Sequence, residues 1–231
     1  MVKLKVLRKL YSRRTFFIIT NMIISFDGNV YAGKTTVINQ ISGDLGATSI
    51  NEHGNFLEPC DFQNPWDLQL RYIEAEARRA KLKVADDIHL LDRSFVSMAA
   101  HVYAMYKIEK VDMRTRFLEE MSSRMMINQV LMPDFFCFVR CANDVIRARI
   151  SADGVRGTDP LYYAEPYLEA IDAFNEAWIK KVDGIVIDTN TGVPIGLTQS
   201  LIDLISSSQN KHSTQKTLGF LRELFALSAA S

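Results

Sequence analysis

The sequence predicts an α/β fold in which a five-stranded parallel sheet is flanked by helices on both faces. Short apolar runs rich in β-branched and aromatic residues alternate with longer amphipathic segments along most of the chain. This alternation is typical of parallel strands joined by crossover helices. A glycine-rich segment directly follows the first apolar run. The chain has 231 residues, 48% of them hydrophobic, which suffices for one sizeable core.

The five expected strands are apolar runs that end in polar, charged or glycine residues. They are the second half of 16–26, then 47–52, 87–95, 133–141 and 184–190. The expected helices have apolar residues at helical spacing. They are 34–46, 67–84, a long region at 97–130, a helix at 143–157 that runs into a basic loop, 164–182 and 196–208.

Composition divides the chain into a basic N-terminal arm at 1–22, a main domain at 23–205, and a linker with a short amphipathic tail at 206–231. The first twenty residues carry several Lys and Arg and no acid. We interpret them as an arm that leads into the first strand of a cytoplasmic protein. A mitochondrial transit peptide is the alternative. The tail is either docked on the domain or an interaction element.

The global composition argues against nucleic acids and membranes as partners. Lys+Arg and Asp+Glu both number 27, so no excess of cations is present to neutralise a nucleic-acid backbone. No run of about 18 apolar residues occurs, so no membrane-spanning helix is expected. Cys60, Cys137 and Cys141 have neither a disulfide framework nor a zinc-site spacing, which favours reduced thiols in a reducing compartment.

The segment DGNVYAGKTT at 27–36 fits the phosphate-binding pattern G-x-x-x-x-G-K-[ST]. Gly28 and Gly33 allow the backbone to curl so that successive N–H groups and the next helix N-terminus face an anion. Lys34 adds a charge toward the β- and γ-phosphates, and the Thr35 hydroxyl is placed to bind Mg²⁺. The context agrees, because a buried strand precedes the motif and a helix follows it. We therefore predict a P-loop fold. The predicted ATP-binding residues of the loop are Gly28, Asn29, Val30, Tyr31, Ala32, Gly33, Lys34, Thr35 and Thr36.

Two further strands end in charged residues, at the sheet edge where open α/β sheets bind ligands. Glu52 could accept a proton from an attacking hydroxyl, or it could be a solvated loop acid. Asp92 can hold Mg²⁺ directly or through water, and Arg93 can clamp a phosphoryl or acceptor oxygen. A plain ion pair at the strand end is the alternative for these two residues.

The helix that ends in a glycine-flanked basic loop predicts a lid over the transferring phosphate. Its candidate ATP-binding residues are Arg147, Arg149 and Arg156. The alternative is a solvated basic helix face, which Arg147 alone also fits.

Four segments resemble the deoxynucleoside kinase family, which is related to the thymidylate kinases. They are DGNVYAGKTT at 27–36, LLDRSFVS at 90–97, PDFFCFVRCANDVIRARI at 133–150 and PYLEAIDAFNEAWI at 166–179. The turn NEHG at 51–54 favours the nucleoside kinases, because thymidylate kinases usually have Arg-Glu-Pro-Gly there. The resemblance implies Mg²⁺-dependent transfer of the γ-phosphoryl group of ATP to the 5′-hydroxyl of a nucleoside, and a homodimer.

The resemblance also implies roles for individual residues. Catalysis would depend on Lys34, on Glu52 as the base, and on Arg93 near the 5′-oxygen. Gln69 would bind the nucleobase, and Asp159 the sugar 3′-hydroxyl. The implied substrate-binding residues are Glu52, Phe62, Trp66, Gln69, Arg93 and Asp159.

Two alternatives to this function remain open. The family has closely spaced lid arginines, whereas here Arg156 is displaced and Asp153 stands where a cation is expected. A nucleotide-binding regulatory or assembly protein with little transfer activity is therefore one alternative. The other is a thymidylate or other nucleoside monophosphate kinase. Arg71, Arg78 or Arg79 would then hold the phosphate of the acceptor.

Overall fold

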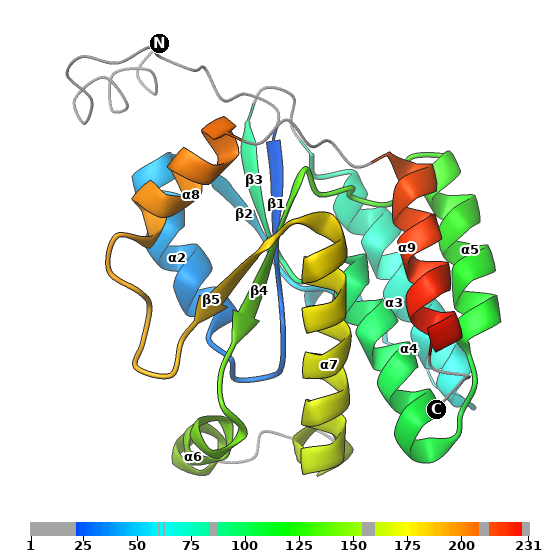
Figure 1. Cartoon of the computed structure of the whole chain (residues 1–231). Coiled ribbons are helices and arrows are strands. Elements are labelled where there is room, and N and C mark those ends of the chain that lie inside the picture. The colour runs from blue at the N-terminus through cyan, green and yellow to red at the C-terminus, as the bar shows by residue number, and fades with distance from the viewer. Residues whose placement is uncertain are drawn as a thin grey trace.

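Five parallel strands form a single sheet in the order β2-β3-β1-β4-β5, which confirms the predicted fold class (Figure 1). The computed structural model describes residues 22–59, 61, 63–83, 87–153, 160–207 and 213–227. The strands are β1 (Met22–Asp27), β2 (Thr48–Ile50), β3 (Ile88–Asp92), β4 (Phe135–Arg140) and β5 (Ile185–Asp188). Several features predicted from the sequence lie outside the described residues. They are the arm up to residue 21, residues 208–212 of the predicted linker, Cys60, Phe62, Arg156 and Asp159.

The central strand β1 has β3 on one side and β4 on the other. Phe26 pairs with Asp92 of β3, and Asp27 pairs with Phe138 of β4. The chain completes one half of the sheet before it crosses to the other half, so the carboxyl end of β1 lies at the topological switch point. Ligands of open α/β sheets bind in the crevice at such a point.

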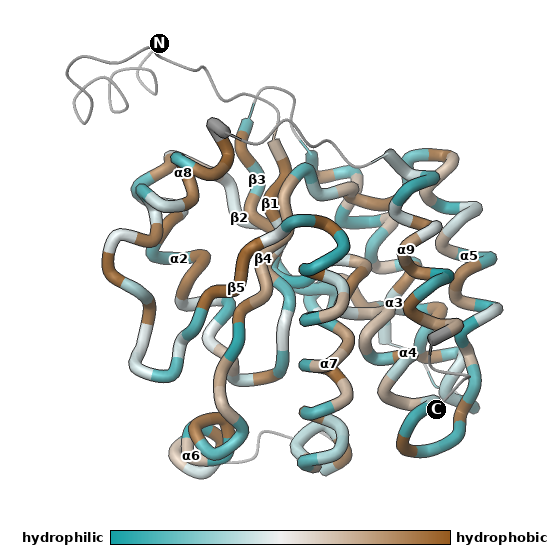
Figure 2. Tube along the Cα trace, in the orientation of Figure 1, coloured by the Kyte–Doolittle hydropathy of each residue, from teal (hydrophilic) through white to brown (hydrophobic). Residues whose placement is uncertain are grey.

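Helices cover both faces of the sheet and bury an apolar cluster on each. One cluster lies against α2 and α8, and the other against α4, α5, α7 and α9 (Figure 1). The inner sides of these helices and the strands between them are the most hydrophobic parts of the trace (Figure 2). The bounds of these helices are α2 (Lys34–Leu45), α4 (Phe95–Glu109), α5 (Arg114–Met126), α7 (Glu165–Val182), α8 (Leu197–Ser207) and α9 (Thr214–Leu227).

Hydrogen bonds and backbone angles at the helix ends determine two boundaries that the spacing of apolar residues did not indicate. Helix α3 (Pro65–Ala80) begins earlier than expected, because the Asn64 side chain accepts a hydrogen bond from the backbone N–H of Asp67 at 3.0 Å. The expected long helix at 97–130 is divided into α4 and α5. Lys110 adopts a left-handed φ of 57°, which ends α4.

Three short or peripheral helices complete the described fold. They are η1 (His53–Phe56), α6 (Asn143–Asp153) and η2 (Pro160–Tyr163). No helix in the described part of the chain is both long and apolar enough to cross a bilayer. Cys137 and Cys141 are buried and free.

The C-terminal helix α9 packs against α5 and α7 (Figure 1). Its buried side chains are Leu218, Leu221, Leu224 and Phe225, which belong to the same apolar cluster as α4 and α7. The Phe225 ring lies 6.1 Å from that of Phe117 on α5, and Lys181 of α7 pairs with Glu223 at 2.5 Å. The tail of the chain is thus docked on the domain.

Truncation of Leu221 should measure how much α9 stabilises the fold. The side chain is fully buried, so Leu221→Ala should lower the free energy of unfolding by about 2–5 kcal/mol. Arg222→Ala changes the neighbouring exposed residue and should cost less than about 0.5 kcal/mol. Equilibrium denaturation in urea measures both variants. Equal, small effects would contradict the docking of α9.

Candidate active site

The loop between β1 and α2 is shaped to receive an anion. Gly28 has a φ of 143°, and a Cβ there would lie 2.2 Å from the Val139 carbonyl oxygen, so only glycine fits. Gly33 has a φ of 91° and leads into α2, whose N-terminus has no side-chain cap. The backbone N–H groups of the first helical turn therefore face the loop without a competing side chain, as in phosphate-binding sites.

Lys34 is buried at the start of α2 and donates to the Asn29 carbonyl oxygen at 2.6 Å. Burial and the nearby positive charge of Arg93 lower the pKa of Lys34 to about 7. The side chain of Asn29 points away from the anion cradle. Its Nδ2 donates to Leu168 O at 3.0 Å and to Asp172 Oδ1 at 2.7 Å, which ties the loop to α7.

Thr35 and Asp92 form a pair of oxygen ligands suited to a hard cation. The Thr35 hydroxyl donates to Asp92 Oδ2 at 2.5 Å. Asp92 Oδ1 is buried without a hydrogen-bond partner, and such an oxygen is normally satisfied. A hydroxyl beside an unsatisfied carboxylate oxygen fits Mg²⁺, which takes oxygen ligands and keeps most of its water or phosphate ligands. Among the described residues, no group of three His, Cys, Asp or Glu forms a separate metal site.

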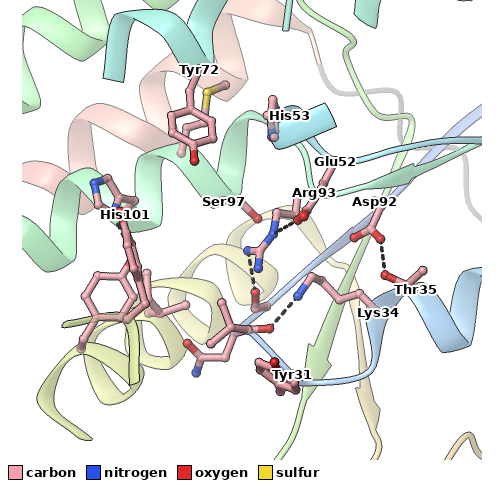
Figure 3. Close-up of a pocket in the computed structure, with 18 of the residues that line it drawn as sticks. Tyr31, Lys34, Thr35, Glu52, His53, Tyr72, Asp92, Arg93, Ser97 and His101 are labelled. Carbon is pink, nitrogen blue, oxygen red and sulfur yellow. Dashed lines mark hydrogen bonds and ion pairs between the residues drawn. The ribbon is translucent and has the colours of Figure 1, made fainter. Parts of the chain in front are cut away.

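Glu52 and Arg93 join the ends of β2 and β3. Arg93 Nε donates to Glu52 Oε2 at 2.9 Å, and Arg93 Nη1 donates to the Gly28 carbonyl at 3.1 Å (Figure 3). Burial opposes ionisation of Glu52, but the charge and hydrogen bond of Arg93 outweigh it, so the pKa of Glu52 is lowered. Glu52 is therefore an anion at neutral pH and can accept a proton.

A buried network behind this pair was not predicted from the sequence. Arg79 and Glu76 of α3 are fully buried and lie 2.7 Å apart. His53 lies 3.0 Å from Glu76. Arg79 Nη2 also donates to the carbonyl oxygens of Asp92 and Arg93 at 3.2 and 2.8 Å. The network thus holds the chain segment that carries the site.

Asp27, at the end of β1, was also not predicted as a site residue. Its carboxylate accepts hydrogen bonds from the backbone N–H and hydroxyl of Ser94, both at 2.8 Å, and from the Ser97 hydroxyl at 2.6 Å. Asp27 therefore ties Ser94, the N-cap of α4, and the first turn of that helix to the end of β1. An acid directly before the glycine of the motif was the available signal.

One cavity of about 420 Å³ opens beside this arrangement. Its inner end includes Glu52, Arg93 and Lys34, and its far end is aromatic (Figure 3). Tyr72 and His101 lie at the far end (Figure 3), and the other lining residues include Gln69, Met98, Tyr162, Tyr163, Tyr167 and Ile171.

The far end of the cavity offers neutral polar groups. The Gln69 side chain is buried, and its Nε2 has no hydrogen-bond partner. His101 Nδ1 lies 2.8 Å from the Tyr167 hydroxyl. Burial and then Arg93 lower the pKa of His101 to about 4, so the imidazole is neutral at physiological pH. A planar heterocycle with its own donors and acceptors matches such a lining.

A second cavity, of about 620 Å³, lies on the other side of the loop. Arg149 of α6 lines it and donates to the carbonyl oxygens of Tyr31 and Thr189 at 2.9 and 2.6 Å. The other lining residues are Tyr31, Gly33, Lys34, Thr35, Thr36, Ala152, Asp153, Thr189, Gly192 and Val193.

Three predicted site residues are described but lie outside both cavity linings, namely Ala32, Trp66 and Arg147. Ala32 is fully buried. Trp66 packs against the apolar cluster of α4 and α7, with the Arg116 guanidinium 4.6 Å from its ring centre. Arg147 is exposed and lies 3.4 Å from Glu165. Neither helix spacing nor charge indicates which way a helix is rotated, so the sequence could not separate Arg147 from Arg149.

Comparison with solved structures identifies P-loop kinases of the same fold. A deoxyadenosine kinase from M. mycoides with bound dATP has a TM-score of 0.55 and 20% identity, covering 81% of this chain and 100% of that chain. The structure of the same kinase with dCMP and dCDP has a TM-score of 0.57 and 20% identity, with the same coverage of both chains. Thymidylate kinase from Candida albicans has a TM-score of 0.58 and 15% identity, covering 84% of this chain and 94% of that chain. Neither a protein-family model nor a curated protein sequence matches the chain. At these identities the similarity shows a shared fold.

Binding of a nucleoside triphosphate should take up a proton near pH 8. Lys34 has a pKa of about 7 in the free chain, so it is mostly neutral at pH 8, and a bound triphosphate should restore its charge. The apparent affinity for ATP should therefore fall as the pH rises above about 7, by up to about tenfold per unit. Titration calorimetry in two buffers of different ionisation enthalpy counts the proton.

Lys34→Arg is the matched control, because a guanidinium stays protonated at pH 8. This variant should bind ATP without proton uptake. Equal uptake by the two proteins would contradict the assignment of the proton to Lys34.

Proposed function

We propose that this chain is a kinase that transfers the γ-phosphoryl group of ATP to the 5′-hydroxyl of a deoxynucleoside or nucleoside. The observation that carries the proposal is the Glu52–Arg93 pair, which lies in the same cavity as Lys34. A base, a cation and a phosphate loop then face a cavity of nucleoside size. The kinases of the same fold support this choice, since two of the structures are of a deoxyadenosine kinase with nucleotides bound.

The residues divide the reaction between them. The acceptor hydroxyl oxygen attacks the γ-phosphorus, its proton passes to Glu52, and the bond to the β-phosphate oxygen breaks to release ADP. Arg93 lies against Glu52 and the loop and would hold the attacking oxygen and balance the charge of the phosphoryl group. Lys34 and the N-terminus of α2 would bind the β- and γ-phosphates.

Thr35 and Asp92 would hold Mg²⁺, which neutralises phosphate charge when bound. Arg149 would act from the opposite side, because it lines the cavity on the ATP side of the loop. It is the candidate lid arginine that this arrangement favours over Arg147.

A nucleoside is favoured over a nucleoside monophosphate as the acceptor. The three arginines that could bind an acceptor phosphate have other partners. Arg79 is enclosed with Glu76, and Arg71 lies 2.9 Å from Glu74. Arg78 donates to the Phe56 carbonyl at 2.9 Å. None of the three belongs to the described lining of the cavity, and an acceptor phosphate there would face the Glu52 carboxylate.

A transfer screen tests the proposal directly. Radiolabelled ATP is supplied with each of the four deoxynucleosides, the ribonucleosides and dTMP, and labelled products are separated. We expect a labelled monophosphate from at least one nucleoside and no product from dTMP. Transfer to dTMP alone would identify a monophosphate kinase. Tight ATP binding without any product would instead support a regulatory role.

Glu52→Gln should separate catalysis from binding. The amide keeps the size of the side chain but cannot accept the proton, so kcat should fall by about 10²–10⁴-fold while the KM for ATP changes little. Glu58→Gln is the control, because Glu58 is an exposed acid of the same segment that pairs with Arg78 at 3.3 Å. A Glu52→Gln variant with the full kcat would exclude Glu52 as the base.

A further inference from the structure

Tyr31 lies where the two cavities meet. The cavities share three lining residues, Tyr31, Lys34 and Thr35. Lys34 and Thr35 belong to the phosphate-binding machinery, so the shared boundary is the place where a phosphoryl group would pass from one cavity to the other. Tyr31 supplies the aromatic surface at this boundary (Figure 3).

The backbone of Tyr31 is held in a conformation that tyrosine rarely adopts. Its φ is 54°, in the left-handed region, which costs a non-glycine residue on the order of 1 kcal/mol. Glycine would adopt this conformation without strain. Such strain persists where the surroundings fix it, and here Arg149 Nη1 donates to the Tyr31 carbonyl at 2.9 Å.

The side chain of Tyr31 reaches from the loop to the helices that flank both cavities. Its hydroxyl lies 3.1 Å from Asp153 Oδ2 at the end of α6. Its ring centre lies 6.4 Å from that of Tyr163 in η2, with the planes at 58°. The ring is therefore held by neighbours on two elements, in a position that a small side chain would leave open.

Every kinase faces competition from water for the γ-phosphoryl group. Water is smaller than any alcohol acceptor, and closure of a site against it suppresses hydrolysis. In this chain Glu52 would serve as a base for a water molecule as readily as for a sugar hydroxyl. A barrier at the junction of the cavities would therefore decide which acceptor reacts.

We propose that the Tyr31 ring is the wall that keeps water from the γ-phosphorus, a role that rests on the proposed function. Without the ring, a water oxygen attacks the γ-phosphorus, the bond to the β-phosphate oxygen breaks, and the products are ADP and inorganic phosphate. The proton of the water passes to Glu52 and then to solvent. The same ATP is consumed, but no acceptor is phosphorylated.

The test compares Tyr31→Gly and Tyr31→Phe with the wild type. ADP release is measured with and without a nucleoside acceptor, next to labelled acceptor product. In Tyr31→Gly, acceptor-free hydrolysis should rise about tenfold, the change that corresponds to a barrier lower by about 1.4 kcal/mol. Tyr31→Phe keeps the ring but loses the hydroxyl contact with Asp153, so its ATP hydrolysis should stay well below that of Tyr31→Gly. The glycine variant relieves the backbone strain, so a thermal melt should show that it remains folded.

Tyr106→Ala is the matched control, because Tyr106 of α4 lines neither of the two described cavities. It should leave ATP hydrolysis unchanged. Unchanged hydrolysis in Tyr31→Gly would overturn the inference, as would an equal rise in Tyr106→Ala or in Tyr31→Phe. Failure of the proposed function looks different: no nucleoside would be phosphorylated by the wild type, while the effect of Tyr31→Gly on ATP hydrolysis would still be measurable.

Discussion

The geometry of the site depends on the turn of the backbone at Arg93. Its φ of 65° lies in the left-handed region, and this conformation is costly for a non-glycine residue. Two contacts hold it. The N–H of Arg93 donates to the Phe26 carbonyl at 3.1 Å, and Arg79 binds the carbonyl of Arg93 at 2.8 Å. The turn directs the guanidinium to Glu52 and Gly28 together. The Arg93 guanidinium thereby connects three segments that are far apart in the sequence.

The support for this turn is itself a buried charge network. Removing Glu76 and Arg79 from water is costly, and a buried pair is stable only if its remaining hydrogen-bonding groups are satisfied. Glu76 meets this condition, since its second oxygen accepts from the Leu131 N–H at 2.8 Å. Burial and then the charge of Arg79 lower the pKa of His53, which keeps this ring neutral beside the pair. An apolar core of equal volume could stabilise the fold as well, but it could not bind two backbone carbonyls of the turn.

The sequence predicted the features of the site that are local. The loop at 27–36 and the charged ends of β2 and β3 are continuous patterns, and parallel strands bring their carboxyl ends to one edge, so Glu52, Asp92 and Arg93 were expected at the ligand-binding edge of the sheet. The sequence did not predict features that depend on how a helix is rotated about its axis. Trp66 faces the apolar cluster, although the family resemblance implied that it binds the substrate. The Glu76–Arg79 pair had a signal, its i,i+3 spacing, but no pattern in the chain indicated that the pair is buried.

Charge is distributed unevenly within the first cavity. Lys34 and Arg93 lie close enough that Arg93 is the second cause, after burial, of the lowered pKa of Lys34. The carboxylates of Asp92, Glu52 and Asp27 act in the opposite direction, but burial and Arg93 outweigh them. The negative charge of a bound triphosphate would add to theirs and favour the protonated form of Lys34. The acceptor end has the opposite character, because His101 is neutral and Gln69 is uncharged. On the proposed function, one highly charged ligand and one neutral ligand would meet at Lys34, and a second phosphorylated ligand would be opposed by Glu52.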